Sequence, residues 1–244
     1  MSTKNAPESL FETIKQTVLV PLHAAGLPFV AGGALATLCF MLVSETLAIL
    51  AGVFTIFCLY FFRDPVRVTP QREELVISPA DGRVINVASN VSLPKEIAPE
   101  NSPATFTKIS IFLSVFDVHV NRIPISGKIL KSAYNPGLFL NASLDKASDK
   151  NERASLLIET DSGRHLGVIQ IAGLVARRII TDVSEGDRVE TGARYGIIRF
   201  GSRADIYLPE GTNALVCVGQ RCVGGETVLA DLVSNETRRE GKAH

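Results

Sequence analysis

The sequence predicts a mainly β protein (α+β), in which a compact antiparallel β-barrel or sandwich follows an N-terminal hydrophobic helical hairpin. Two observations carry this prediction. Residues 27–62 are almost continuously apolar, whereas short apolar runs separated by turn residues recur over residues 66–233. The first pattern suits two long helices, and the second is typical of antiparallel β domains. We therefore expect a tail and hairpin over residues 1–62 and a β-rich domain over residues 63–244.

The composition suits a folded chain with a large core and excludes some functions. Hydrophobic residues make up 46% of the 244 residues, and 25 Lys and Arg balance 25 Asp and Glu. A neutral chain without a basic stripe lacks the footprint of a nucleic-acid-binding protein, so no nucleic-acid partner is expected. The four cysteines lie in apolar runs without C-x-x-C spacing. We expect reduced, buried thiols in a cytosol-facing protein, and no metal site.

The hairpin is predicted from charge alone. Residues 27–43 and 47–62 contain no charged side chain, and only Ser-Glu-Thr at 44–46 separates them. A helix that crosses a bilayer needs roughly 17–25 apolar residues, so each half is near the lower limit. A signal peptide fits poorly, because the apolar stretch is too long and starts too late. The alternative is a buried helix pair in a soluble core.

Basic residues around the hairpin predict its orientation. Two lysines precede it and three arginines follow it: Lys4, Lys15, Arg63, Arg67 and Arg72. The turn between the two spans has no basic residue. By the positive-inside rule, both ends lie in the cytoplasm. We expect a protein attached to the cytoplasmic face of the inner membrane, with its β domain beginning next to the lipid.

The elements of the β domain are predicted from short apolar runs and turn signals. Strands are expected over residues 76–77, 84–87, 109–123, 156–160 and 166–171. The sequence Glu-Gly-Asp-Arg-Val at 185–189 predicts a strand–turn–strand passage. A helix is expected over residues 142–153, and the charged tail after Asn235 is expected to be loose.

A Gly-Ser pair between two apolar strand runs is the first candidate site. Gly201 allows a strained backbone and leaves its own carbonyl unobstructed, so Ser202 can attack that carbonyl. The product is an ester, and elimination from the ester breaks the chain. The alternative is a β-bulge in which the glycine makes a bend.

Asp81 and His119 are two further candidate catalytic residues. The Asp81-Gly82 pair predicts a hairpin turn, and Asp81 can alternatively orient a histidine and stabilise its positive charge. In one extended strand, Asp117, His119 and Asn121 share a face, because side chains alternate. That face is either a solvent-exposed polar edge or the place of a general base. A histidine has a near-neutral pKa, which makes His119 the best candidate base in the chain.

Taken together and in order, these motifs resemble the phosphatidylserine decarboxylase family, most closely its short bacterial type. The resemblance covers about residues 55–235. Its motifs are Phe-Phe-Arg-Asp-Pro at 61–65, Ser-Pro-Ala-Asp-Gly at 78–82, Val-His-Val-Asn-Arg at 118–122, Asn-Glu-Arg at 151–153, Ile-Ala-Gly-Leu-Val-Ala-Arg-Arg-Ile at 171–179 and Arg-Phe-Gly-Ser-Arg at 199–203.

The resemblance implies a proenzyme that cuts itself between Gly201 and Ser202. The products are a β chain, residues 1–201, and an α chain, residues 202–244, whose first residue becomes a covalent pyruvoyl cofactor. The family's Asp-His-Ser group corresponds to Asp81, His119 and Ser202.

The resemblance also implies the reaction and the partners. The pyruvoyl group forms a Schiff base with the amine of phosphatidylserine and accepts the electrons released as carbon dioxide leaves. The product is phosphatidylethanolamine, made for phospholipid biosynthesis. The implied partners are phosphatidylserine, membrane lipid and the two fragments of the chain itself, as a heterodimer whose further homo-oligomerisation stays open.

Two positions depart from the longer members of the family. Those members have two histidines three residues apart, whereas Arg122 stands here at the second position. Either His119 serves in both self-cleavage and decarboxylation, or Arg122 binds the substrate carboxylate. The cleavage point is Phe-Gly-Ser-Arg instead of Leu-Gly-Ser-Thr, which retains the Gly-Ser bond.

Two other classes of protein fit parts of the sequence. The turn at 185–189 is similar to that of biotinyl and lipoyl carrier domains, which supports a related barrel or sandwich fold. A carrier needs a lysine at a hairpin tip, and none occurs between Lys150 and Lys242. A membrane-anchored adaptor that stays uncut therefore remains the alternative. A Ser-His-Asp hydrolase would also stay uncut, but the chain lacks the G-x-S-x-G elbow.

Overall fold

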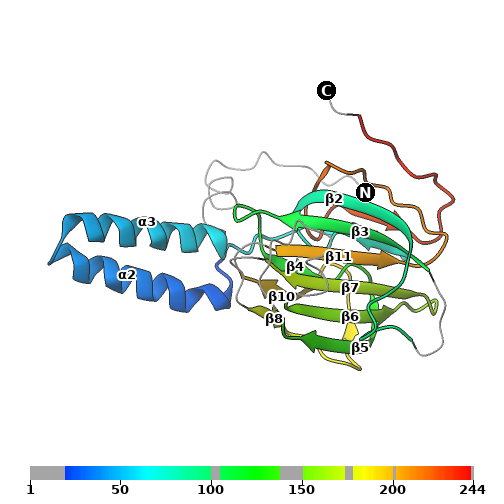
Figure 1. The fold of residues 1–244 in the computed structure, drawn as a ribbon, viewed down its shortest axis with the longest axis horizontal. Helices are drawn as coiled ribbons and strands as arrows, with labels where there is room; N and C mark the ends of the chain where they lie inside the picture. Colours follow the sequence, from blue (N-terminus) through cyan, green and yellow to red (C-terminus); the bar gives the residue numbers. More distant parts are fainter. Residues whose placement is uncertain (1–19, 100–104, 138–150, 174–177, 200–201, 243–244) are drawn as a thin grey trace, which may run out of the picture. The chain divides into compact units, whose positions relative to one another are not determined.

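A computed structural model gives the fold of the chain and confirms that it is mainly β, with antiparallel strands and an N-terminal apolar helical hairpin. The chain forms two compact units, Met1–Val66 and Arg67–His244, which we describe separately (Figure 1). The structure describes residues 20–99, 105–137, 151–173, 178–199 and 202–242.

The first unit is the helical hairpin. A 3-10 turn, η1 (Ala24–Gly26), leads into α2 (Leu27–Met41), and α3 (Glu45–Phe61) returns beside it (Figure 1). Pro28 stands in the first turn of α2, where a missing N–H leaves no bond unmade. Glu45 lies in the first turn of α3, where the helix dipole favours a negative charge.

Small residues let the two helices approach closely. A Cβ on Gly33 would lie 2.5 Å from the Oγ1 of Thr55, and one on Gly52 would lie 3.8 Å from the Cγ2 of Thr37. The two threonine hydroxyls donate to carbonyls of their own helices, Thr37 to Gly33 at 2.8 Å and Thr55 to Ala51 at 2.7 Å. The hairpin therefore satisfies these hydroxyls internally, as an apolar environment requires.

The outer surface of the hairpin is apolar. Leu35, Met41, Leu42 and Ile56 are among its many exposed large hydrophobic side chains. Within the part of the chain that the structure describes, one helical segment, Ala24–Met41, is long and apolar enough to cross a membrane, and α3 is a shorter apolar helix. A surface of this kind is unfavourable in water, so it indicates an apolar partner.

All four cysteines are free thiols, but the prediction that all are buried is wrong in part. Cys58 and Cys222 are buried, whereas Cys217 is half-buried and Cys39 is exposed. Cys39 is exposed because it lies on the outer surface of α2, where the neighbouring apolar side chains are exposed as well.

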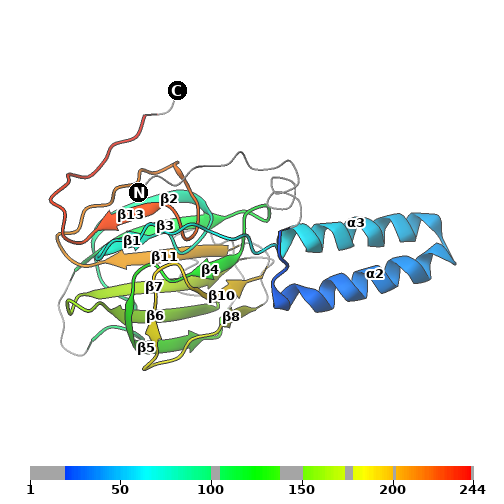
Figure 2. The same cartoon turned by 180° about the vertical axis from the view of Figure 1, so that it is seen from behind.

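The described residues of the second unit form three antiparallel sheets (Figures 1 and 2). The largest curls into a half-barrel, in the order β12-β2-β3-β11-β7-β6-β5-β9. Its strands are β2 (Gly82–Val91), β3 (Phe106–Leu113), β5 (Gly127–Asn135), β6 (Arg153–Glu159), β7 (His165–Ala172), β9 (Arg188–Val189), β11 (Ser202–Leu208) and β12 (Arg221–Cys222). The smaller sheets are β4 (Val120–Arg122), β10 (Arg194–Ile198) and β8 (Ile179–Thr181), in that order, and the pair β1 (Leu75–Ile77) and β13 (Val228–Asp231).

The core lies between the large sheet and the two smaller ones. Ile109 and Ile206 from the large sheet belong to one buried cluster with Val76, Tyr195 and Leu229 from β1, β10 and β13. A second cluster covers the other face, where a loop brings Leu93 and Ile97 over β7 and β11. Because both faces of β11 are covered, all seven of its residues are buried.

The strand expected over residues 109–123 is wrong as a single element. β3 ends at Leu113, and β4 begins at Val120 in a different sheet. A turn separates them, in which the Asp117 Oδ2 accepts hydrogen bonds from the backbone N–H and the hydroxyl of Ser114, both at 2.8 Å. The turn contains neither glycine nor proline, and the alternation of apolar residues continues through it. The sequence pattern therefore predicted one continuous strand.

Of the other predicted elements, two strands and one turn are confirmed, and one helix is wrong at its end. The strands expected at 156–160 and 166–171 are confirmed as β6 and β7. The turn at 185–189 is confirmed by the positive φ of +93° at Gly186 and by the pairing of β9 with β5. Of the helix expected over 142–153, residues 142–150 lie outside the described residues. Its end is wrong, because Arg153 begins β6 and pairs with Ile171.

Candidate active site

Ser202 is the first residue of β11, in the middle of the large sheet. It pairs with Leu113 on β3 and with Ala172 on β7, and its side chain is fully buried. Its Oγ has no hydrogen-bond partner among the described residues. A buried hydroxyl without a hydrogen bond lowers the stability of the fold by about 1–3 kcal/mol, so the presence of Ser202 here calls for a functional explanation. Gly201, the other half of the expected cleavage point, lies outside the described residues.

His119 follows the Ser114–Asp117 turn and directly precedes β4. Its Nδ1 lies 2.9 Å from the carbonyl oxygen of Asp117. A carbonyl can only accept, so Nδ1 carries the proton, and Nε2 is then the ring nitrogen that could take a proton from a nucleophile. The solvent-exposed polar edge considered from the sequence is wrong: Asp117, His119 and Asn121 are all buried, because β4 packs inside the unit.

Ile198 and Ala172 connect the segment that carries His119 with the strand that carries Ser202. The backbone N–H of Ile198, at the end of β10, donates to the carbonyl of His119 at 3.2 Å. The side chain of Ile198 packs with Ala172, which is the cross-strand neighbour of Ser202. The backbones of the base candidate and the nucleophile candidate are therefore linked through Ile198 and Ala172, although 82 residues lie between the two candidates in the sequence.

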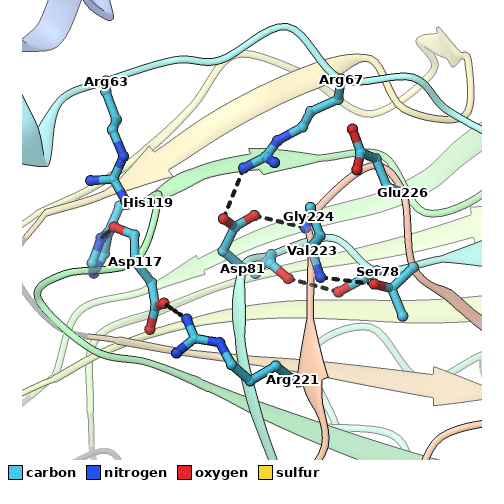
Figure 3. Close-up of polar contacts among 12 residues, drawn as sticks. Arg63, Arg67, Ser78, Asp81, Asp117, His119, Arg221, Val223, Gly224 and Glu226 are labelled. Carbon is cyan, nitrogen blue, oxygen red and sulfur yellow. Dashed lines mark hydrogen bonds and ion pairs between the residues drawn. The ribbon is translucent and has the colours of Figure 1, made fainter. Parts of the chain in front are cut away.

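Asp81 lies in the turn before β2. Its carboxylate accepts hydrogen bonds from the Arg67 Nη2 at 2.8 Å and from the backbone N–H of Gly224 at 2.7 Å (Figure 3). The aspartate and arginine side chains are only 16% and 15% exposed. Gly82 is required after it, because a Cβ there would lie 2.2 Å from the carbonyl oxygen of Phe112.

The turn that carries Asp81 is attached to both other elements of the site. The carbonyl of Pro79 accepts a hydrogen bond from the backbone N–H of Arg122 at 2.9 Å, which holds the turn against β4. Ala80 packs with Leu113 and Ala204, the first of which is a cross-strand neighbour of Ser202. Figure 3 shows Asp81, Asp117 and His119 in one close-up, with the Asp81 carboxylate directed toward Arg67 and Gly224.

A buried amide network, which sequence analysis missed, connects the strands of the site. The Gln170 Nε2 donates to the Asn121 Oδ1 at 2.7 Å, and the Thr181 Oγ1 donates to the Gln170 Oε1 at 3.1 Å. The network ties β4, which follows His119, to β7, which pairs with Ser202. A single polar residue in the apolar run at 168–171 was the available signal.

Three arginines near the site also have partners that the sequence did not reveal. Arg203 is fully buried, and its guanidinium binds Asp205 through two hydrogen bonds of 2.6 and 2.7 Å. Arg221 is exposed and forms an ion pair with the buried Asp117 at 2.5 Å. Arg122 is buried and donates to a backbone carbonyl, that of Gly192, at 3.0 Å.

A buried serine whose hydroxyl has no hydrogen-bond partner among the described residues, and a buried histidine linked to its strand through Ile198 and Ala172, define a candidate site for serine chemistry on an antiparallel β scaffold. The family model of phosphatidylserine decarboxylase matches residues 54–230. The chain belongs to this family, which confirms the resemblance, and it is an enzyme of the family's type.

Three relatives, each named phosphatidylserine decarboxylase proenzyme, show the extent of the similarity. The protein of Cereibacter sphaeroides is 53% identical over 227 residues, which cover 93% of this chain and 97% of the relative. That of Granulibacter bethesdensis is 52% identical, with coverages of 94% and 92%. That of Beijerinckia indica is 50% identical, with coverages of 94% and 97%.

Proposed function

We propose that this chain is the proenzyme of a phosphatidylserine decarboxylase, which cuts itself between Gly201 and Ser202 and converts Ser202 into a pyruvoyl group. The observation that carries the proposal is the Ser202 hydroxyl, buried and without a hydrogen-bond partner among the described residues. Because relatives of this chain are named proenzymes, we assign the hydroxyl the role of nucleophile in self-cleavage.

Self-cleavage has two stages, an acyl shift from nitrogen to oxygen and then elimination of the resulting ester. The Ser202 Oγ attacks the Gly201 carbonyl carbon while the Nε2 of His119 takes the hydroxyl proton, and the peptide nitrogen leaves to give an ester. Loss of the Cα proton of residue 202 then breaks its Cβ–Oγ bond, and Gly201 departs as a carboxylate. Water replaces the nitrogen of the resulting dehydroalanine and ammonia leaves. In this scheme Asp81 stabilises the positive charge that develops on His119 through its negative charge, since its carboxylate bonds to Arg67 and Gly224 and the Nδ1 of His119 bonds to the Asp117 carbonyl.

The surroundings of Ser202 fit a pyruvoyl group. Conversion removes the unpartnered Oγ and turns Cβ into a methyl group, which suits the apolar neighbours Leu113 and Ala172. When present, the group supplies a ketone for the substrate amine and an electron sink for the pair left by carbon dioxide. The chain's own contribution is to bury that position, and we assign proton transfer there to His119.

The two fragments are expected to stay together as a heterodimer. The smaller fragment supplies β11 to the middle of the large sheet, β12 to its edge and β13 to the pair with β1. The N–H of Gly224 from this fragment also binds Asp81 of the larger one. Separation would expose the apolar face of β11 and both neighbouring strand edges, so folding stability holds the fragments together.

The substrate is a lipid, and the N-terminal unit suits a lipid surface. Residues 1–62 are the proposed anchoring part and residues 63–244 the catalytic part. The exposed apolar side chains of α2 and α3 support contact with acyl chains, and the flanking basic residues support the cytoplasmic face of the inner membrane.

Intact mass under denaturing conditions tests the proposal. We expect two chains, residues 1–201 and 202–244, the smaller one lighter by one ammonia than a chain that starts with serine. Ser202→Ala should remain one chain and release no carbon dioxide from phosphatidylserine. Ser184→Ala, an exposed serine, is the matched control and should be cut normally. A wild-type chain that stays uncut with anionic lipid would favour the adaptor instead.

A further inference from the structure

The turn between β3 and β4 holds a phenylalanine ring in contact with water. Phe116 is 65% exposed, whereas Phe106 is buried and Phe112 is half-buried in the preceding strand. The turn is well bonded, because the backbone N–H of Asp117 donates to the Ser114 carbonyl at 2.9 Å, in addition to the two bonds that the Asp117 carboxylate accepts from Ser114. The fold therefore keeps this ring outside the core, although burial of a phenylalanine is stabilising.

Two exposed arginines adjoin this turn. Arg221 on β12 forms its ion pair with the Asp117 carboxylate at 2.5 Å (Figure 3), and Arg83 on β2 is the direct cross-strand partner of Arg221. Opposite residues of an antiparallel pair lie on one face of the sheet, with Cβ atoms about 4.5–5.5 Å apart. Arg83 is also the partner of Phe112, the next-to-last residue of β3. The register therefore brings both arginine positions to the end of the sheet where the turn with Phe116 begins.

The charge at this surface is positive on the outside. The side chain of Arg221 is 71% exposed and Arg83 is exposed as well, whereas the side chain of Asp117 is only 8% exposed. The negative charge is therefore covered, and the positive charges face the solvent. A single exposed apolar side chain is common on proteins. An exposed aromatic ring next to exposed arginines is instead typical of surfaces that bind anionic lipid, because the ring enters the head-group region and guanidinium groups bind phosphates.

We propose that Phe116, Arg83 and Arg221 form a membrane-docking patch, with which the β unit binds an anionic phospholipid bilayer. Phe116 enters the boundary between head groups and acyl chains, and the two arginines bind lipid phosphates. The patch is distinct from the hairpin, whose exposed surface is apolar. The inference rests on the proposed function, since docking brings the catalytic unit to the bilayer that contains its substrate.

The membrane-docking patch is attached to the candidate base. The residue that pairs with Arg221 also holds His119, because the carbonyl of Asp117 accepts a hydrogen bond from the His119 Nδ1 at 2.9 Å. Phe116 precedes His119 by three residues. The bilayer therefore meets the β unit within three residues of the candidate base, where a lipid substrate is needed.

A tryptophan reporter tests whether the patch enters lipid. The chain contains no tryptophan, so Phe116→Trp gives a single signal. The full-length variant is reconstituted in vesicles of phosphatidylcholine, with and without phosphatidylglycerol, which is anionic but is not the proposed substrate. With phosphatidylglycerol, the emission should shift to shorter wavelength, and spin-labelled lipid should quench it. Val233→Trp is the matched control and should emit as in water. Val233 is 62% exposed and lines a surface cavity with Pro209, at the end of β11 away from Ser202.

Two fluorescence results would overturn the proposal. If the reporter at position 116 emits as in water on anionic vesicles, the patch does not enter lipid, and a protein partner becomes the alternative occupant. If the reporters at positions 116 and 233 are quenched equally, the β unit adsorbs to the vesicle without a defined docking surface.

Arg83→Gln tests the charge of the patch without removing the partner of Asp117, and it does not depend on the tryptophan reporter. Decarboxylation of phosphatidylserine is measured in vesicles with phosphatidylglycerol and, separately, on a short-chain phosphatidylserine dissolved as a monomer. The rate on vesicles should fall about fivefold, as expected for the loss of one basic residue at an anionic surface, and the rate on the monomer should not change. Arg188→Gln, which removes an exposed arginine paired with Asp161, is the matched control and should change neither rate.

The two rates decide the role of Arg83. An equal loss on vesicles and on the monomer would place Arg83 in substrate binding or catalysis, and no loss on either would exclude its charge from docking. Both results contradict the proposal.

Failure of docking is distinguishable from failure of the proposed function. The fluorescence test needs no cleavage, so Phe116→Trp should show the same shift in the uncut Ser202→Ala chain. A wild type that stays uncut or releases no carbon dioxide contradicts the proposed function, whereas the reporter at position 116 still decides whether the patch docks.

Discussion

The two units treat polar groups in opposite ways. In the hairpin, the hydroxyls of Thr37 and Thr55 bond within their own helices, and apolar side chains face outward. In the β unit, apolar side chains face inward, and buried polar groups such as Gln170 bond across strands far apart in the sequence. The first arrangement suits an apolar solvent and the second suits water. The difference predicts that polar substitutions act locally in the hairpin and globally in the β unit.

The largest effect is expected from the buried ion pair of β11. Asp205→Ala leaves the fully buried guanidinium of Arg203 without its carboxylate partner, which should lower the free energy of unfolding by about 3–5 kcal/mol. Urea denaturation of the uncut Ser202→Ala chain, followed by tyrosine fluorescence, measures it. The exposed pair of Arg239 and Glu236 provides the control, and Glu236→Gln should leave the free energy of unfolding unchanged within error, because water screens the pair. Equal losses in the two variants would contradict the comparison.

The hairpin should respond to volume instead of charge. Gly33→Leu places a side chain where even a Cβ lies 2.5 Å from the Thr55 Oγ1, so the helices must separate, at a cost of about 1–3 kcal/mol. Circular dichroism during thermal unfolding in detergent micelles measures the loss of helix. Gly32→Leu is the matched control, because a Cβ at the neighbouring position meets no atom within 4 Å. If both variants melt alike, close helix packing at Gly33 does not hold the hairpin together.

The amide network should couple stability to self-cleavage. Gln170→Leu leaves the buried Asn121 and the Thr181 hydroxyl without their bonds to Gln170, which should cost about 1–3 kcal/mol. It should also slow cutting, since β4 follows His119 directly. A time course of intact mass measures the cutting rate, and denaturation measures the stability. Gln170→Glu can still accept from Thr181 but cannot donate to Asn121, so it should cut at an intermediate rate. Loss of stability with an unchanged cutting rate would make the network purely structural.

The same contrast explains what the sequence predicts and what it does not. The hairpin is predictable because a helix satisfies its own backbone, so the absence of charge over residues 27–43 and 47–62 suffices. β6 and β7 are predictable from apolar runs. The break between β3 and β4 is not, because the bond between Asp117 and Ser114 replaces the usual turn residues. The position of Arg178 opposite Arg199 at the ends of β8 and β10 is not predictable either, since it depends on the register of these two strands.

The family resemblance predicts which residues form the site but not how they are arranged in space. Ser202, His119 and Asp81 are predicted through motifs, and the structure gathers their elements around Ala172, Ile198 and Leu113. The partners Arg67 and Gly224 of Asp81 depend on contacts between segments more than ten residues apart, which no local pattern records. Long-range pairing is therefore the part of a β site that a single sequence leaves undetermined.

The smallest effect is expected in thiol labelling, which compares a cysteine of the hairpin with a cysteine of the β unit directly. Burial, the largest cause, raises the pKa of Cys222 to about 12, so this thiol stays protonated and should not react in the folded protein. Cys39 is exposed on the hairpin. If acyl chains cover it, a charged maleimide should fail to label Cys39 in lipid vesicles, whereas a membrane-permeant maleimide should label it. Mass spectrometry of the labelled chain measures both, with urea-unfolded protein as the full-labelling control. Rapid labelling of Cys39 by the charged reagent would place the hairpin surface in water and remove the membrane anchor from the proposal.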